Sequence, residues 1–218
     1  MLTADADFAF ASRARDGVIP AESGRERTGL AEVSDEDLCR KVATGDGQAF
    51  ELLVERHQAR AFRLACSILK NESDARDVSQ DAFIKLYESA GRFDGRSRFS
   101  TWFYRVLVNL CIDRGRRDRW WRRVVPLSSA SDDPDTPGID PASPDEGPEV
   151  AAMQVQAAGL LGDALERLSP HQRIAVLLQA QEGLSSREIA EVLKCSESTA
   201  RVHIHRGLAQ LKKMLKDD

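Results

Sequence analysis

The sequence predicts an all-α protein of two small helical domains joined by an acidic, proline-rich linker, and three observations support this fold class. Apolar residues recur at spacings of three and four, which is typical of amphipathic helices. Residues 126–149 interrupt this pattern with prolines and acidic residues, which predicts a linker. Residues 183–208 have a helix-turn-helix pattern, so the C-terminal domain is expected to adopt that motif.

Charge is distributed very unevenly along the 218 residues. The net charge of the whole chain is only −4. Residues 91–123, however, contain ten arginines against three aspartates, so this segment has a net charge of +7. Residues 127–149 contain acidic residues and no basic ones. Such segregation predicts different partners for different segments.

The composition also argues against several classes of protein. The four cysteines have neither zinc-ligand nor redox-motif spacing, so we expect free thiols, no metal and no cofactor. Apolar runs are too short for a membrane span, and charged residues interrupt the N-terminus where a signal peptide would be apolar. A cytoplasmic protein without membrane insertion is expected.

The N-terminal domain is expected to begin after a mobile tail over residues 1–30. Ser34 starts a capping-box-like pattern, and the helix after the 45–47 turn has a long apolar stripe. His57 lies on that stripe and is interpreted as a packed histidine, because no nucleophile, base and acid set accompanies it. An enzyme that uses His57 or a cysteine is therefore the weakest of the alternatives.

The helix over residues 74–87 has one apolar and one acidic face. Its apolar face contains Ala75, Val78, Ala82, Phe83 and Leu86. The opposite face contains Asp77, Gln80 and Asp81. From the residues alone, an ordinary solvated acidic face is slightly favoured.

Residues 91–123 combine arginines with aromatic rings. All three tryptophans lie here, with Phe93, Phe99, Phe103 and Tyr104. Arginines neutralise phosphates, and unpaired bases stack on aromatic rings at about 1–3 kcal/mol per base. A solvated basic helix with core aromatics is an equally good interpretation. Turn formers predict a loop before Thr101, and a helix with one apolar face follows it.

The C-terminal segment begins with an expected helix over residues 149–168. Ser169 and Pro170 start the next helix, which Gly183 ends. Ser185 and Glu188 form a capping box for a helix over 186–193, and a second helix follows over 197–216. Its predicted buried face is Ala200, Ile204, Leu208, Leu211 and Leu215. Ser198, Arg201, Val202 and His205 share an exposed face, which in this motif enters the major groove of DNA.

The sequences at 74–83, 93–105 and 108–114 together resemble region 2 of bacterial sigma factors, and the extracytoplasmic-function (ECF) group is the most similar. The resemblance implies a compact domain over residues 31–125 that binds the clamp of the RNA polymerase beta-prime subunit through Asp77, Gln80 and Asp81. It also implies a loop that captures an extruded base of the minus-ten element and a helix that contacts the non-template strand. The implied contact residues are Asp94, Arg96, Ser97, Arg98, Phe99, Ser100, Trp102, Tyr104, Arg105, Asn109 and Arg116.

Residues 168–173 and 183–208 resemble region 4 of the same family, which implies that residues 150–218 bind the minus-thirty-five element and the beta flap of polymerase. The implied contacts are Ser198, Thr199, Arg201, Val202, His205 and Arg206. Val202 and His205 are candidates for contacts with base edges, whereas Arg206 suits a phosphate. Gly207 replaces the usual alanine, and we expect it to weaken the helix slightly.

The predicted function is therefore that of a non-enzymatic ECF sigma factor, which recruits core RNA polymerase to promoter DNA and captures the melted non-template strand. In the family, the linker threads through polymerase toward the RNA path, but a solvated spacer is an equally good interpretation of residues 126–149. An anti-sigma factor is implied by the resemblance alone. The alternative is a stand-alone helix-turn-helix regulator in which residues 91–123 form a plain basic patch.

Overall fold

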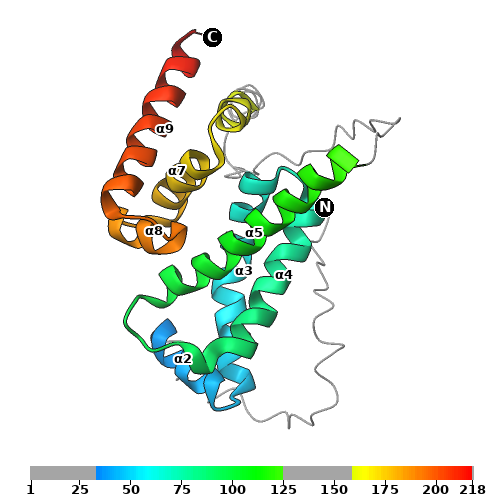
Figure 1. The fold of residues 1–218 in the computed structure, drawn as a ribbon. Coiled ribbons are helices and arrows are strands. Elements are labelled where there is room, and N and C mark those ends of the chain that lie inside the picture. Colours follow the sequence, from blue (N-terminus) through cyan, green and yellow to red (C-terminus); the bar gives the residue numbers. More distant parts are fainter. Residues whose placement is uncertain (1–32, 125–158, 218) are drawn as a thin grey trace, which may run out of the picture. The chain divides into compact units, whose positions relative to one another are not determined.

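The computed structural model of the protein describes residues 33–124 and 159–217, with side chains placed for 33–117 and 159–216. Within these ranges every regular element is a helix, as the sequence predicts (Figure 1). The tail over residues 1–30, the linker over 126–149 and the first half of the 149–168 helix lie outside the described residues. So do the side chains of Trp120 and Trp121. The described residues from Ser34 onward form one compact unit.

The first group of helices contains α2 (Asp35–Ala43), α3 (Gly47–Leu69), α4 (Glu72–Ser89) and α5 (Phe99–Val124), with the short 3-10 helix η2 (Ala90–Arg92) before α5. Polar side chains cap the starts of α2, α3 and α4. Ser34 accepts a hydrogen bond from the amide of Asp37, Asp46 from Ala49 and Asn71 from Asp74. Each cap gives a hydrogen-bond acceptor to an amide that would otherwise lack one, and a cap of this kind typically stabilises a helix by about 1 kcal/mol.

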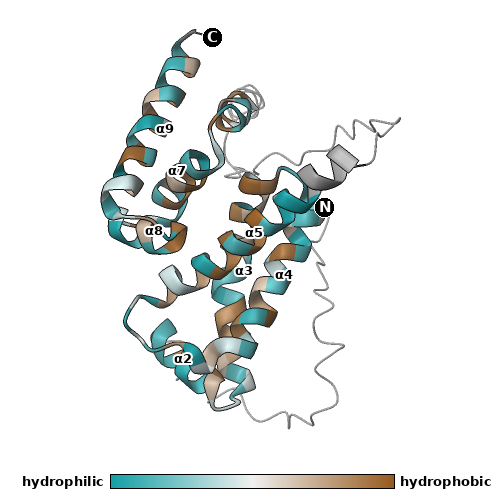
Figure 2. Cartoon of the chain, viewed as in Figure 1, coloured by the Kyte–Doolittle hydropathy of each residue, from teal (hydrophilic) through white to brown (hydrophobic). Residues whose placement is uncertain are grey.

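The core of this group lies where α3, α4 and α5 pack on one another. Figure 2 shows hydrophobic turns along these three helices. Leu53 and Leu64 of α3, Phe83 of α4, and Phe103 and Leu107 of α5 are almost completely buried. Truncating a buried phenylalanine to alanine typically costs about 3–5 kcal/mol, so these side chains dominate the stability of the group.

The second group of helices contains a helix over residues 159–166, α7 (Pro170–Glu182), α8 (Ser186–Leu193) and α9 (Glu197–Asp217). Gly183 ends α7 in the left-handed conformation at φ +66°. Ser185 and Glu188 form the predicted capping box of α8. The turn before α9 begins at Lys194, which is also left-handed. The predicted helix-turn-helix is therefore present over α8 and α9.

One side of α9 is buried against α7 and α8, and this buried stripe is narrower than predicted. Ala200, Ile204 and Leu211 are buried, but Leu208 and Leu215 are 46% and 45% exposed. The prediction that these two leucines are buried is therefore wrong. At 100° per residue these three buried positions fall within an arc of about 40°, and the two leucines lie just outside it.

Gly207 completes this buried stripe for a steric reason. A Cβ atom on Gly207 would lie 2.7 Å from Cγ2 of Val176 in α7, which is closer than real Cβ contacts. The glycine therefore lets α9 approach α7 closely, a role that the sequence prediction of a weakened helix missed.

The four cysteines are free thiols, as expected. Burial raises the pKa of Cys39 to about 11 and the pKa of Cys111 to about 12. Burial also raises the pKa values of Cys66 and Cys195, which are partly exposed. At neutral pH the buried thiols of Cys39 and Cys111 therefore remain protonated.

Candidate nucleic-acid interface

The loop between η2 and α5 presents arginines on a turn that Asp94 stabilises. Oδ1 of Asp94 accepts a hydrogen bond from the amide of Arg96 at 3.1 Å, and its Oδ2 lies 3.2 Å from Nε of Arg96. Gly95 has φ +70°, a conformation that glycine adopts without strain. The side chains of Arg96 and Arg98 are 89% and 78% exposed, so both guanidinium groups are accessible to phosphates.

The aromatic residues beside this loop are buried. Phe99 has no exposed surface, and Tyr104 and Trp102 are 2% and 7% exposed. The ring of Trp102 packs on Phe93 and Phe99, with centroids 5.5 and 6.3 Å away. In this structure the three predicted stacking residues therefore belong to the packed interior and offer no open face to a base.

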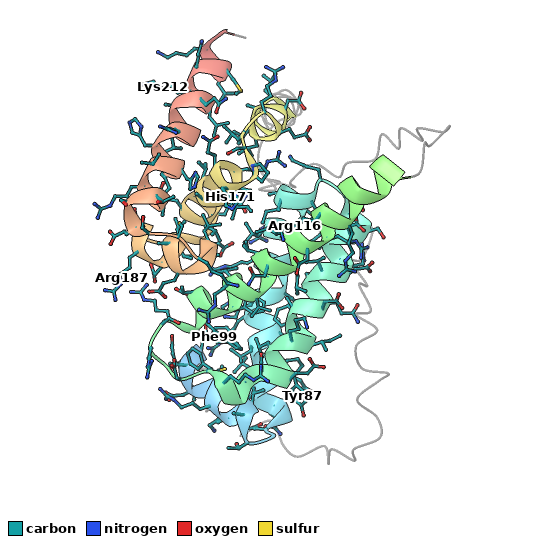
Figure 3. All side chains as sticks on the ribbon, viewed as in Figure 1. Tyr87, Phe99, Arg116, His171, Arg187 and Lys212 are labelled. Atoms are coloured by element: carbon teal, nitrogen blue, oxygen red, sulfur yellow. The ribbon has the colours of Figure 1, made fainter. Side chains whose placement is uncertain are left out.

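The remaining predicted contacts of the N-terminal domain have accessible surface. Asp94, Arg96, Arg98 and Arg116 are exposed, and Ser97, Ser100, Arg105 and Asn109 are partly exposed. Figure 3 labels Phe99 at the beginning of α5 and Arg116 further along it. Arg116 lines a cleft of about 390 Å³ together with Cys111 and His171.

The N-terminal turn of α2 holds the beginning of α5. Oε1 of Glu36 accepts a hydrogen bond from the amide of Phe99 at 2.9 Å. Asp35 lies 2.7 Å from Nε2 of His57 and 2.6 Å from Nη1 of Arg56. The hydrogen bond from His57 lowers the pKa of Asp35, burial opposes this shift, and Arg56 adds to it.

His57 is the packed histidine that the sequence predicts. It is 5% exposed, and its ring lies 5.2 Å from that of Phe99 and 6.0 Å from that of Phe103. Among the described residues, its Nδ1 is buried without a hydrogen-bond partner. Sequence reasoning missed both Asp35 and Glu36, because each lies far along the chain from the group that it contacts.

The acidic face of α4 is partly neutralised by α5. Nε of Arg114 donates to Asp74 at 2.9 Å, and its Nη2 donates to Asp77 at 3.2 Å. These carboxylates, Asp74 foremost, raise the pKa of Arg114. Asp77 and Asp81 are exposed and Gln80 is partly exposed, so the predicted polymerase-binding face remains accessible.

The six predicted contact residues of α9 are all exposed: Ser198, Thr199, Arg201, Val202, His205 and Arg206. The amide of Thr199 donates to Oγ of Ser196 at 3.1 Å, which caps the start of the helix. Arg201 pairs with Glu197 one turn earlier. Because this face holds donors, two cations and one apolar side chain, it has the chemistry that reads major-groove edges and phosphates.

Two glutamates of the C-terminal helices contact predicted DNA-binding residues of α5 and the loop before it. The hydroxyl of Tyr104 donates to Glu182. Oγ1 of Thr101 donates to Oε1 of Glu188 at 3.4 Å, and Nε of Arg98 lies 3.7 Å from the same oxygen. Burial raises the pKa of Tyr104, and its bond to Glu182 adds to the shift. Hydrogen bonds from Ser185 lower the pKa of Glu188.

Comparison with known proteins identifies the family. The Sigma-70 region 2 family matches residues 53–122, and the Sigma-70 region 4 family matches residues 158–211. The RNA polymerase sigma-H factor of Pseudomonas aeruginosa is 33% identical over 85% of this chain and 96% of its own length. The ECF sigma factor SigW of Bacillus subtilis is 30% identical over 82% of this chain and 95% of its own. The chain belongs to the ECF group of RNA polymerase sigma factors.

Solved structures support the fold of this ECF sigma factor. CnrH, in complex with the cytosolic domain of CnrY, matches with a TM-score of 0.61 at 24% identity over 85% of this chain and 99% of that one. RpoE of Bartonella quintana, in complex with the anti-sigma factor NepR, matches with a TM-score of 0.59 at 22% identity. The match covers 78% of this chain and 98% of that one. The predicted family and fold class are confirmed. Within the described ranges, no helix of the ECF sigma factor combines the length and the apolarity needed to cross a bilayer.

Proposed function

We propose that this sigma factor directs core RNA polymerase to promoters through two separate DNA-binding surfaces. Residues 31–125 bind polymerase and the minus-ten element, and residues 150–218 bind the minus-thirty-five element. The observation that carries the proposal is the face of α9, where every predicted contact residue is exposed beside a buried apolar stripe. The protein acts as a non-enzymatic subunit of polymerase in the cytoplasm.

In the N-terminal domain, the proposed surface for melted DNA is the loop before α5. Arg96 and Arg98 supply exposed cations for phosphates, and Asp94 holds the turn that presents them. The buried positions of Phe99 and Trp102 favour a supporting role, in which they form the floor under the captured base. Arg105, Asn109 and Arg116 continue the surface along α5 for the non-template strand.

The exposed acidic face of α4 supports the proposed contact with polymerase. We assign Asp77, Gln80 and Asp81 to the contact with the beta-prime clamp, and the C-terminal domain to the contact with the beta flap. We also propose that an anti-sigma factor regulates the protein, because RpoE, which has a similar fold, was solved with the anti-sigma factor NepR.

Reconstituted transcription tests the proposal. The full-length protein is added to core RNA polymerase with a library of randomised promoters, and the transcripts are sequenced. We expect transcripts only when the protein is present, from promoters that share two sequence blocks at a fixed spacing. Binding to duplex DNA without any promoter-dependent transcript would instead favour a stand-alone regulator.

A further inference from the structure

We propose that Glu36 is a positioning residue for the loop that captures the extruded base, an inference that rests on the proposed function. Glu36 lies in the first turn of α2, outside the loop over residues 94–98 and outside α5. Its Oε1 nevertheless accepts the backbone hydrogen bond of Phe99 at 2.9 Å. Phe99 is the first residue of α5, so this bond fixes the downstream end of the loop.

The beginning of α5 needs such a partner. The first amides of a helix have no acceptor within the helix, and a side chain at the N-cap usually supplies one. The amide of Trp102 donates to the carbonyl of Arg98 at 3.1 Å, which places Arg98 at the N-cap position. A guanidinium group has donors and no acceptor, so Arg98 cannot cap the helix. Glu36 supplies the missing acceptor from a different helix, and its negative charge suits the positive end of the helix dipole.

A second connection makes this anchor rigid. Asp35, the residue before Glu36, binds both Arg56 and His57 of α3. The ring of His57 packs against that of Phe99. The first turn of α2 therefore holds Phe99 by two routes, one through its backbone amide and the other through its ring.

The loop residues proposed to contact the base lie directly before this anchor. Arg96 and Arg98 are highly exposed, so the geometry of the loop depends on its two ends and on the turn that Asp94 stabilises. Without the carboxylate of Glu36, the first turn of α5 loses its fixed position while the buried core below it remains. The expected result is poorer discrimination among bases, with binding to polymerase through α4 unchanged.

Variants of two neighbouring residues separate positioning from stability. Glu36→Ala removes the acceptor, whereas Glu36→Gln keeps an oxygen at the same place. Asp37→Ala is the matched control, because Asp37 binds Ser34 and Arg40 within or next to its own helix. All three replace one acid in the first turn of α2, but only Glu36→Ala removes the bond to Phe99.

The experiment uses holoenzyme assembled from core polymerase and each full-length variant. Affinity is measured on fork-junction DNA with each of the four bases at the unpaired minus-ten position, and core binding and thermal unfolding are measured separately. We expect Glu36→Ala to reduce the preference for the best base by about five- to tenfold, the effect of losing one helix cap. Glu36→Gln should restore most of that preference, and Asp37→Ala should leave it unchanged.

Two other results would overturn the inference. A wild-type preference in Glu36→Ala would show that the bond does not position the loop. An equal loss in Glu36→Ala and Asp37→Ala, together with lower unfolding temperatures, would assign both residues to the stability of α2. If the wild-type holoenzyme itself has no base preference on the fork, the proposed function fails instead, so the two failures are distinguishable.

Discussion

At Gly207, a single hydrogen in place of a side chain sets how closely α9 packs on α7. An alanine would favour the helix by about 1 kcal/mol on propensity alone. Its Cβ would overlap Val176, and overpacking of this kind costs about 1–3 kcal/mol. We therefore expect Gly207→Ala to lower the thermal stability of the C-terminal domain. A compensating Val176→Ala change should recover part of the loss.

Gly115 in α5 is the control for this prediction. A Cβ there would meet no atom within 4 Å, so Gly115→Ala should follow helix propensity and raise stability. Differential scanning calorimetry of the two variants compares packing with propensity directly. Stabilisation by both would contradict the packing role of Gly207.

We expect the stability of the C-terminal domain to depend on pH through His203. Its ring stacks on that of His171 with centroids 5.7 Å apart, and burial, His171 and Arg206 together lower its pKa. Below about pH 6.5 the unfolded chain then binds more protons than the folded chain, so stability falls as the pH falls. We expect urea unfolding to show this loss between pH 7.5 and 5.5 and His203→Gln to reduce it. An identical pH dependence in the variant would contradict the assignment to His203.

At the scale of elements, we propose that α9 combines residues that read bases with residues that contact the DNA backbone. We expect His205→Ala to reduce discrimination at one base pair of the upstream element by about 1–3 kcal/mol. Arg206→Ala should weaken binding to all sequences alike. It should also lower the slope of the binding constant against salt concentration by the amount that corresponds to about one phosphate contact. Binding titrations on a set of single-base variants at three salt concentrations test both. If His205→Ala instead lowers the affinity for all sequences equally, His205 contacts the DNA backbone and not a base edge.

On the acidic face of α4, replacing Asp81 tests polymerase binding alone, whereas replacing Asp77 also changes a contact with α5. Asp77 also binds Arg114 of α5, so its replacement disturbs the packing of α4 and α5 as well as the face. Asp81 is exposed, and Asp81→Arg should weaken core binding while leaving the unfolding temperature unchanged. Fluorescence anisotropy with labelled core polymerase measures this, and unaltered assembly would contradict the proposed role of α4.

Local signals explain why the helices were predictable and several contacts were not. Caps such as Ser34, Asn71 and Ser185 act on amides three residues away, so the sequence reveals where helices begin. Glu36 and Phe99 are 63 residues apart, and no local pattern relates them. The aromatic residues near the loop were ambiguous for another reason. A ring that supports a helix and a ring that stacks on a base have the same side chain, and only their burial separates the two roles.

At the scale of the whole molecule, we infer that the contacts of Glu182 and Glu188 compete with promoter DNA for Tyr104 and Arg98, two predicted contact residues of the N-terminal domain. Tyr104 and Arg98 cannot bind these carboxylates and DNA with the same atoms. We expect Glu182→Ala to raise the affinity of the free protein for fork-junction DNA by about three- to tenfold. A hydrogen bond to a charged group contributes about 1.5–3 kcal/mol, and only part of this free energy opposes the binding of DNA. Electrophoretic mobility shifts measure this effect.

Glu191→Ala is the control for the change in charge. Glu191 pairs with Arg187 one turn along α8, so its replacement removes one negative charge without touching α5. Equal gains in the two variants would attribute the effect to net charge alone. A gain confined to Glu182→Ala would attribute it to the bond with Tyr104.

The buried, protonated thiols of Cys39 and Cys111 simplify the design of fluorescence probes for such rearrangements. Maleimide dyes react with thiolates, and an exposed cysteine introduced by mutation ionises far more readily at neutral pH than these two. Dyes on cysteines introduced at Glu88 and Lys212, two exposed positions on α4 and α9, would therefore attach ahead of the buried pair. With the partly exposed Cys66 and Cys195 replaced by serine, energy transfer between the dyes would follow the separation of α4 and α9 during initiation while Cys39 and Cys111 stay in place.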